Sequence, residues 1–96
     1  MFVISLSYTV PLTQVDAHLA AHRDYLAAQY AAGSFLMSGA KVPRDGGIIL
    51  AHVPSRAALE SILSEDPFAL AGLARYEITE FTPTMTAEAL SAWRAR

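Results

Sequence analysis

The chain contains no cysteine, few charged residues and no long apolar run, and each shortage excludes a class of protein. Without cysteine there is no disulfide, no thiol nucleophile and no thiolate metal ligand, and this absence fits a reducing compartment. No apolar run approaches the roughly 20 residues that span a bilayer. The first residues also lack the basic leader and the small-residue cleavage site of a signal peptide. We therefore expect a cytoplasmic protein without a membrane partner.

Charged residues make up 17% of the 96 residues, where about 25% is typical. The formal net charge is -2, so electrostatics offers no reason to bind nucleic acid. Hydrophobic residues make up 53%, which excludes a disordered chain. The length predicts one domain, residues 1–96, since typical domains have about 100–150 residues. The surplus of apolar residues predicts a second buried surface, so we expect a homodimer or a higher homo-oligomer.

Local patterns predict the secondary structure. Residues 2–9 alternate between two faces, one of them fully apolar or aromatic, which predicts a strand. Thr13 followed by Asp16 predicts a helix start with Thr13 as N-cap, and Gly33 predicts its end. Ser55 is predicted to cap a later helix. The remaining predicted elements are strands at 35–38, 48–53 and 75–81, helices at 56–65 and 87–94, and a short turn that ends at Gly72.

This order of elements predicts an α+β, ferredoxin-like βαββαβ fold with an extra C-terminal helix. The two main helices cover one face of the sheet, and neither face is purely polar, as five residues indicate: Val3, Ile49, Ala51, Val53 and Phe81. Two such sheets packed face to face would bury the uncovered surface. The sequence therefore predicts a dimeric α/β barrel.

The first helix carries a histidine on its apolar face. At 100° per residue, one stripe of the helix contains Val15, Leu19, His22, Leu26 and Tyr30. The imidazole of His22 is therefore expected to point toward the core. An unpaired buried polar group is unfavourable, so the ring requires a hydrogen-bond partner.

Several short segments share a characteristic order and spacing: His22-Arg23-Asp24-Tyr25-Leu26, Gly33, Phe35-Leu36-Met37-Ser38-Gly39, Pro43-Arg44-Asp45-Gly46-Gly47, Glu65-Asp66-Pro67-Phe68 and Ile78-Thr79-Glu80-Phe81. In these segments the chain resembles the YCII-related (YciI-like) family over residues 1–83. The resemblance implies a dimeric ferredoxin-like barrel, with His22 and Asp66 as the active-site pair. Many relatives have proline where this chain has Ala40, so the loop 40–47 departs from the family pattern.

The resemblance also implies a range of activities. Some relatives are linked to dehydrochlorination of chlorinated aromatic rings, and the wider barrel superfamily includes muconolactone isomerases and small monooxygenases. An imidazole exchanges protons near neutral pH, and a carboxylate on one ring nitrogen would fix its tautomer. His22 and Asp66 are therefore predicted catalytic residues. Two structural interpretations remain beside this one: a satisfied core histidine, and an Asp66 that only caps the helix begun by Pro67.

Three further residues are candidates for substrate binding. Arg44 lies in a glycine-rich loop and suits a carboxylate, although loop charges are mostly just solvated. Ser38 and Tyr8 are polar groups that could equally serve packing. His18 and His22 have the spacing of two metal ligands on a helix, but no third ligand accompanies them. We therefore expect no metal and no cofactor.

These observations predict a small-molecule enzyme that uses a His/Asp pair for acid-base chemistry. The substrate would be small, and cyclic or carboxylate-bearing, and the reaction would be an isomerisation or an elimination such as dehydrochlorination. The alternative is a non-catalytic protein, either a small-ligand-binding module or an oligomeric accessory protein, in which the same pair is structural.

Overall fold

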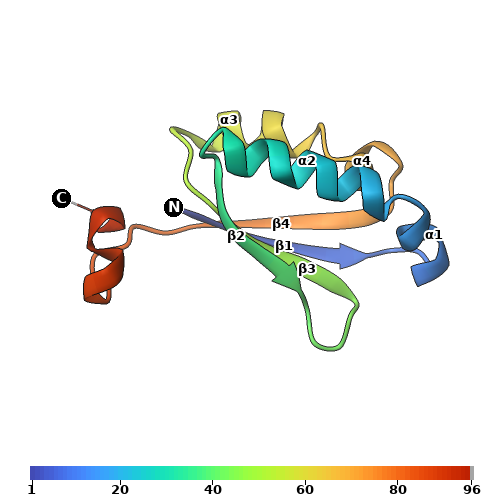
Figure 1. Ribbon diagram of the computed structural model, residues 1–96, viewed down its shortest axis with the longest axis horizontal. Coiled ribbons are helices and arrows are strands. Elements are labelled where there is room, and N and C mark those ends of the chain that lie inside the picture. The colour runs from blue at the N-terminus through green and yellow to red at the C-terminus, as the bar shows by residue number, and fades with distance from the viewer. Residues whose placement is uncertain (96) are drawn as a thin grey trace.

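A four-stranded antiparallel sheet with its helices on one face forms the body of the computed structural model, which describes residues 1–95 (Figure 1). The elements are β1 (Phe2–Tyr8), α1 (Leu12–Ala17), α2 (Leu19–Ala31), β2 (Phe35–Ala40), β3 (Gly46–Ala51), α3 (Arg56–Leu63), α4 (Pro67–Leu70), β4 (Ala74–Glu80) and η1 (Glu88–Trp93). The strand order is β2-β3-β1-β4. This topology confirms the predicted α+β, ferredoxin-like fold.

The core lies between the sheet and the helices. Alternate residues of the central strand β1, namely Phe2, Ile4 and Leu6, are buried, as the period-two pattern predicted. From the helix layer, Leu59 and Phe68 pack into the same cluster. Ser55 caps α3 by accepting a hydrogen bond from the backbone N–H of Ala58 at 3.1 Å, which confirms the predicted cap.

The predicted first helix is divided into two. The prediction of one continuous helix with Thr13 as N-cap is wrong, because α1 is capped at Pro11 without a side-chain bond and ends at His18. The ring of His18 donates from Nδ1 to the carbonyl of Gln14 at 3.1 Å, and the backbone N–H of His18 donates to the carbonyl of Val15 instead. The side chain thus takes the acceptor that the N–H of residue 18 would use in a continuous helix.

The strand predictions also shift at their ends. Gly39 does not end β2, which continues to Ala40 and has its irregularity between Phe35 and Met37. β3 begins at Gly46, two residues before the predicted start, and ends at Ala51 rather than 53. A Cβ at Gly46 would lie 1.8 Å from the carbonyl oxygen of Leu6, so this glycine permits close pairing with β1. Gly46 and Gly47 therefore belong to a strand, although two consecutive glycines are typical of turns.

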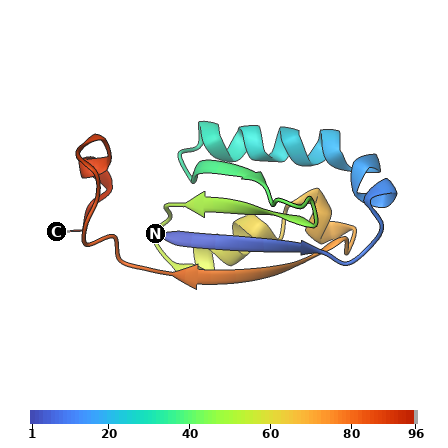
Figure 2. The same ribbon diagram turned by 90° about the horizontal axis from the view of Figure 1, so that it is seen from below.

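The opposite face of the sheet is not covered by helices, as Figure 2 shows with the strands in front. Ile48 and Met37 on this face are 40% and 59% exposed. Ile49 and Ala51, two of the five residues that make neither face purely polar, are both buried in the core on the helix side. The predicted C-terminal helix is a 3-10 helix, η1, and stands away from the sheet (Figure 1). Among residues 1–95, no helix is long and apolar enough to cross a membrane.

Candidate functional site

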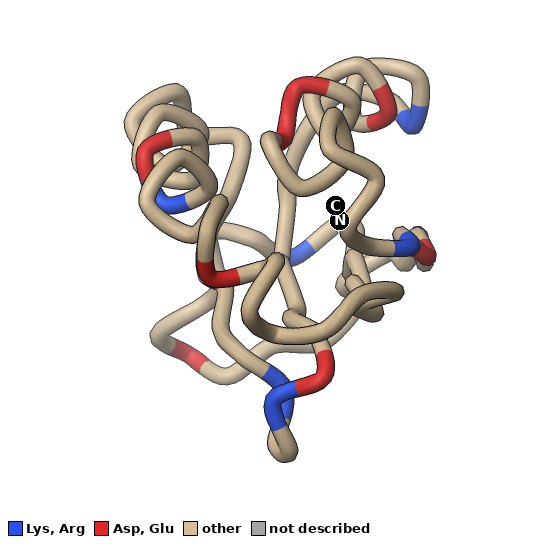
Figure 3. The backbone as a smooth tube through the Cα atoms, turned by 90° about the vertical axis from the view of Figure 1, so that its right-hand side faces the viewer, with Lys and Arg blue, Asp and Glu red and all other residues tan. Residues whose placement is uncertain are grey.

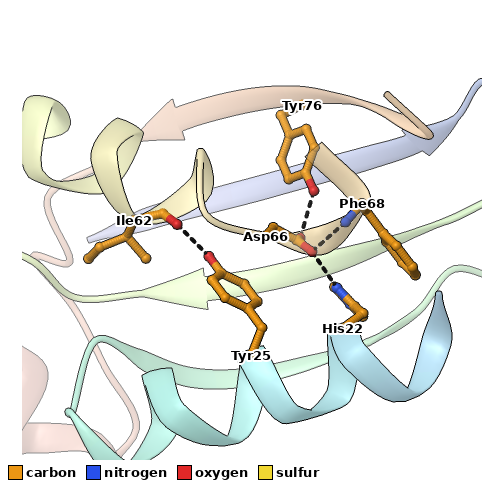
Figure 4. Close-up of polar contacts among 6 residues, drawn as sticks. All are labelled: His22, Tyr25, Ile62, Asp66, Phe68 and Tyr76. Atoms are coloured by element: carbon orange, nitrogen blue, oxygen red, sulfur yellow. Dashed lines mark hydrogen bonds and ion pairs between the residues drawn. The ribbon is translucent and has the colours of Figure 1, made fainter. Parts of the chain in front are cut away.

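His22 and Asp66 meet in the interior although 44 positions separate them in the sequence. His22 comes from α2 and is 9% exposed, and Asp66 precedes α4 and is 0% exposed. Nδ1 of His22 lies 2.8 Å from Oδ1 of Asp66 (Figure 4). The structure thus brings together the two residues that the sequence singled out.

The sequence around Asp66 explains why this carboxylate lies where it does. Asp66 is the N-cap of α4 and accepts from the backbone N–H of Phe68 at 3.0 Å, with Pro67 in the first turn. Proline is favoured at the first helical position because it needs no hydrogen-bond acceptor there. Capping and pairing with His22 therefore occur together, and an interpretation in which Asp66 only caps the helix is wrong.

A tyrosine completes the surroundings of the carboxylate. Tyr76 on β4 donates from its hydroxyl to Oδ2 of Asp66 at 2.6 Å (Figure 4). Burial is the main factor that raises the pKa of the Tyr76 phenol, and the bond to Asp66 raises it further. The carboxylate thus accepts hydrogen bonds from three groups, and His22 donates to it from Nδ1.

Phe68 fixes the plane of the imidazole. Its ring is stacked on that of His22, with 3.9 Å between centroids and 6° between planes. Because Nδ1 is bound to Asp66, Nε2 is the nitrogen left for exchange with a ligand. The pair is therefore restrained in both position and tautomer.

A cavity of about 370 Å³ opens beside the pair. His22 and Phe68 line it from the helix layer, and Tyr8, Ser38 and Arg44 line it from the strands and the β2–β3 loop. The backbones of three glycines form part of its wall, namely Gly39, Gly46 and Gly47. All three predicted binding residues thus border the same cavity as the predicted base. A cavity of this size admits a small molecule.

The model of the YCII-related domain matches residues 1–82 of the chain. The chain belongs to the YCII-related family. Among solved structures, the YCII-related domain is similar to 5-chloro-2-hydroxyhydroquinone dehydrochlorinase (TftG) from Burkholderia phenoliruptrix AC1100 in complex with 2,5-dihydroxybenzoquinone. The TM-score is 0.73 at 22% sequence identity, and the alignment covers 84% of this chain and 92% of that one, so the two share a fold. No curated protein matches the chain.

Two of the polar side chains at the cavity of this YCII-related domain are engaged within the chain. Arg44 Nη2 lies 2.5 Å from Oδ1 of Asp16, and both side chains are exposed. This hydrogen bond is the main factor that raises the pKa of Arg44. Ser38 Oγ is hydrogen-bonded to the hydroxyl of Tyr30. A ligand that binds these groups must compete with intramolecular partners.

Charged residues border the cavity from the β2–β3 loop and from α2. In Figure 3 this loop, at the bottom of the view, carries neighbouring basic and acidic positions. Arg44 from this loop and Arg23 from α2 line the cavity, whereas Lys41 is not part of its wall and donates to Ser7 Oγ at 3.3 Å. No sequence pattern assigns a role to Arg23, which lies next to His22 in the chain.

The sequence did not predict that Tyr76 contacts Asp66 or that Tyr25 lies beside the ring of His22. Tyr25 donates from its hydroxyl to the carbonyl of Ile62 at 2.8 Å (Figure 4). Burial is the main cause that raises the pKa of Tyr25, and the charges of Asp66 and Glu65 add to it. The sequence signal that Tyr76 faces the core is its period-two spacing from Ile78, which places both residues on the helix side of β4.

Within residues 1–95, no three residues among His, Asp and Glu lie close enough to hold a metal ion.

Proposed function

We propose that this YCII-related domain catalyses proton transfer on a small cyclic or carboxylate-bearing substrate, as an isomerase or as a lyase of the dehydrochlorinase type. His22 is the acid-base group, and Asp66 holds its tautomer and stabilises the imidazolium. The observation that carries the proposal is the 2.8 Å contact between these two buried groups, made at the wall of a cavity. An oriented imidazole beside a ligand-sized space is what general acid-base catalysis requires.

The proposed reaction needs only the side chains of the cavity. Nε2 of His22 takes a proton from a carbon or hydroxyl of the substrate, and the positive charge that forms is stabilised by Asp66. If the imidazolium returns the proton to another atom, the product is an isomer. If the electron pair of that C–H or O–H bond instead forms a C=C or C=O bond while the C–Cl bond breaks, chloride leaves with the C–Cl electron pair. The substrate has then lost HCl, and the imidazolium passes its proton to water.

Binding of the substrate is assigned to the cations and hydroxyls around the cavity. Arg44 is the proposed anion contact, because a guanidinium binds a carboxylate or an ionised ring hydroxyl with two donors. Ser38 and Tyr8 supply neutral hydrogen bonds. The solved neighbour is named as a dehydrochlorinase and was captured with a hydroxylated quinone, which makes hydroxylated rings the first substrates to test.

A second candidate is a non-catalytic small-ligand-binding or accessory protein. It is favoured by the full satisfaction of Asp66 within the chain, since each polar contact of the carboxylate also serves the fold. Under this hypothesis the pair stabilises the contact between α2 and α4, and the cavity binds a ligand that leaves unchanged.

One experiment separates the two candidates. The purified protein is screened by thermal shift against hydroxylated and chlorinated quinones, hydroquinones, small cyclic acids and lactones, and each ligand that binds is assayed for turnover. His22→Ala should abolish turnover, and the matched control His18→Ala should not, because His18 is bonded to Gln14 rather than to Asp66. Unchanged turnover in His22→Ala would refute the catalytic role. Binding without turnover by the unsubstituted protein supports the second candidate.

The proposed assembly is a homodimer formed through the open face of the sheet. The supporting observation is an apolar groove of about 480 Å³ at the end of that face, where Leu36 and Met37 meet Leu90 and Trp93 of the C-terminal segment. Exposed apolar surface of this kind is typical of a protein interface. A second copy of the sheet would cover it, as in two layers packed face to face.

A further inference from the structure

The carboxylate of Asp66 is held from two layers of the fold. Oδ1 accepts from His22 Nδ1 at 2.8 Å and from the backbone N–H of Phe68 at 3.0 Å, both in the helix layer. Oδ2 accepts from the hydroxyl of Tyr76 at 2.6 Å, which comes from β4 in the sheet (Figure 4). The two oxygens therefore have different partners, and among residues 1–95 the hydroxyl of Tyr76 is the donor to Oδ2.

We propose that Tyr76 is a positioning residue for the His22–Asp66 pair, and that its hydroxyl keeps the carboxylate turned so that Oδ1 faces the imidazole. The inference rests on the proposed function for its catalytic meaning, but its structural content is independent of any substrate. Tyr76 acts through Asp66, because the residues that line the cavity include His22 and Phe68 but neither Asp66 nor Tyr76.

Burial makes this single hydroxyl important. Asp66 is 0% exposed, so water cannot replace a lost donor without a rearrangement. The phenol of Tyr76 is a dependable donor, because its raised pKa keeps the proton on the oxygen throughout the neutral range. A hydrogen bond to a charged group is also stronger than one between neutral groups.

Loss of the hydroxyl has a defined consequence for the imidazole. Without the Tyr76 hydroxyl, Oδ2 loses the donor that it has in residues 1–95, and the carboxylate relieves this by turning about its Cβ–Cγ bond. This rotation weakens the hydrogen bond between Oδ1 and Nδ1. The neutral ring of His22 then shifts from the Nδ1–H tautomer toward the Nε2–H tautomer, which has no free lone pair facing the cavity.

The test reads the tautomer of His22 directly, by the ¹⁵N chemical shifts of its two ring nitrogens in the ligand-free protein. Three variants are compared with the unsubstituted chain: Tyr76→Phe, Tyr25→Phe and Asp66→Asn. Tyr25→Phe is the matched control, because it removes another half-buried phenol close to the His22 ring whose hydroxyl is bonded to Ile62 rather than to Asp66. Asp66→Asn gives the tautomer ratio of His22 when its partner is an amide instead of a carboxylate.

Tyr76→Phe should lower the ratio of Nδ1–H to Nε2–H tautomers by about tenfold, the scale of one charge-assisted hydrogen bond, and Tyr25→Phe should leave it unchanged. An unchanged ratio in Tyr76→Phe, or an equal fall in both tyrosine variants, overturns the proposal. Should Tyr76→Phe not fold, the hydroxyl proton of Tyr76 is followed instead. It should be far downfield in the unsubstituted protein and move upfield in Asp66→Asn, and the absence of this movement also overturns the proposal.

These outcomes are distinct from failure of the proposed function. If His22→Ala leaves turnover intact while Tyr76→Phe changes the tautomer, the catalytic role is refuted and the positioning role stands. If His22→Ala abolishes turnover while Tyr76→Phe leaves the tautomer ratio unchanged, the positioning role is refuted and the catalytic role stands.

Discussion

The ring of Phe68 lies flat against the imidazole of His22, with 3.9 Å between the centroids and 6° between the planes. Phe68 is 1% exposed and belongs to α4, the helix that Asp66 caps. One short segment therefore supplies both the hydrogen-bond partner and the stacking partner of the histidine. The segment fixes the imidazole in two directions, along its Nδ1–Oδ1 contact and perpendicular to its plane.

Phe68→Ala should reduce the free energy of unfolding by about 3–5 kcal/mol, because it opens a cavity in the core and removes the stacked face of His22. Leu70→Ala in the same helix is the control. Leu70 is 74% exposed, so its loss should change stability by no more than about 0.5 kcal/mol. Urea unfolding followed by circular dichroism measures both values. Similar effects of the two substitutions would contradict the placement of Phe68 in the core.

Gly46→Ala should lower the free energy of unfolding by about 1–3 kcal/mol, the usual cost of overpacking. The added Cβ would lie 1.8 Å from the carbonyl oxygen of Leu6 and would force β3 away from β1. Gly39→Ala is the matched control at the same cavity, because no atom outside its chain neighbours lies within 4 Å of a Cβ built there. Thermal unfolding should separate the two variants clearly. A Gly46→Ala variant as stable as Gly39→Ala would show that the strands are not paired as described.

Stability should fall at alkaline pH because of the buried phenols. The pKa of Tyr76 is raised in the folded state above the ordinary value of 10.0. Below pH of about 10 both states keep the proton, and above it the unfolded chain loses the proton first, so the free energy of unfolding declines as pH rises. The decline should be smaller in Tyr76→Phe. Denaturant unfolding on both sides of that pH measures it, and an identical decline in the variant would contradict the prediction.

The proposed homodimer should be disrupted by a charge on the open face of the sheet. Met37→Glu is expected to convert the dimer to a monomer, because a buried unpaired carboxylate is strongly unfavourable. Leu70→Glu adds the same charge to an exposed apolar residue of α4 and should leave the dimer intact. Sedimentation velocity at micromolar concentration compares the three proteins. A monomer in the unsubstituted protein, or equal behaviour of both variants, would refute this interface.

Local signals in the sequence were enough to predict the fold. The alternation in residues 2–9, the serine before α3 and the left-handed Gly33 each act within a few residues of the element that they define. The inward direction of His22 follows from helical periodicity, and the Asp66-Pro67 pair marks the start of a helix. Sequence reasoning could therefore place both members of the pair on the right elements.

The remaining features depend on contacts between distant segments. The break at His18 arises because a side chain competes for a backbone carbonyl, which periodicity does not reveal. Gly46 is a strand residue only because the carbonyl of Leu6 approaches it across the sheet. Tyr76 joins Asp66 through the packing of β4 beneath α4, and Arg44 pairs with Asp16 across 28 positions. No local signal encodes such pairings.

The measurement that most directly tests the central claim is transfer of solvent deuterium to a ligand identified by the screen. In D₂O the unsubstituted protein should incorporate deuterium into the recovered substrate or product. His22→Ala should do so more slowly by a factor on the order of 10²–10⁴, the usual contribution of a general acid or base. His18→Ala should match the unsubstituted protein. Equal incorporation by the His22→Ala variant would contradict the assignment of His22 as the group that moves the proton.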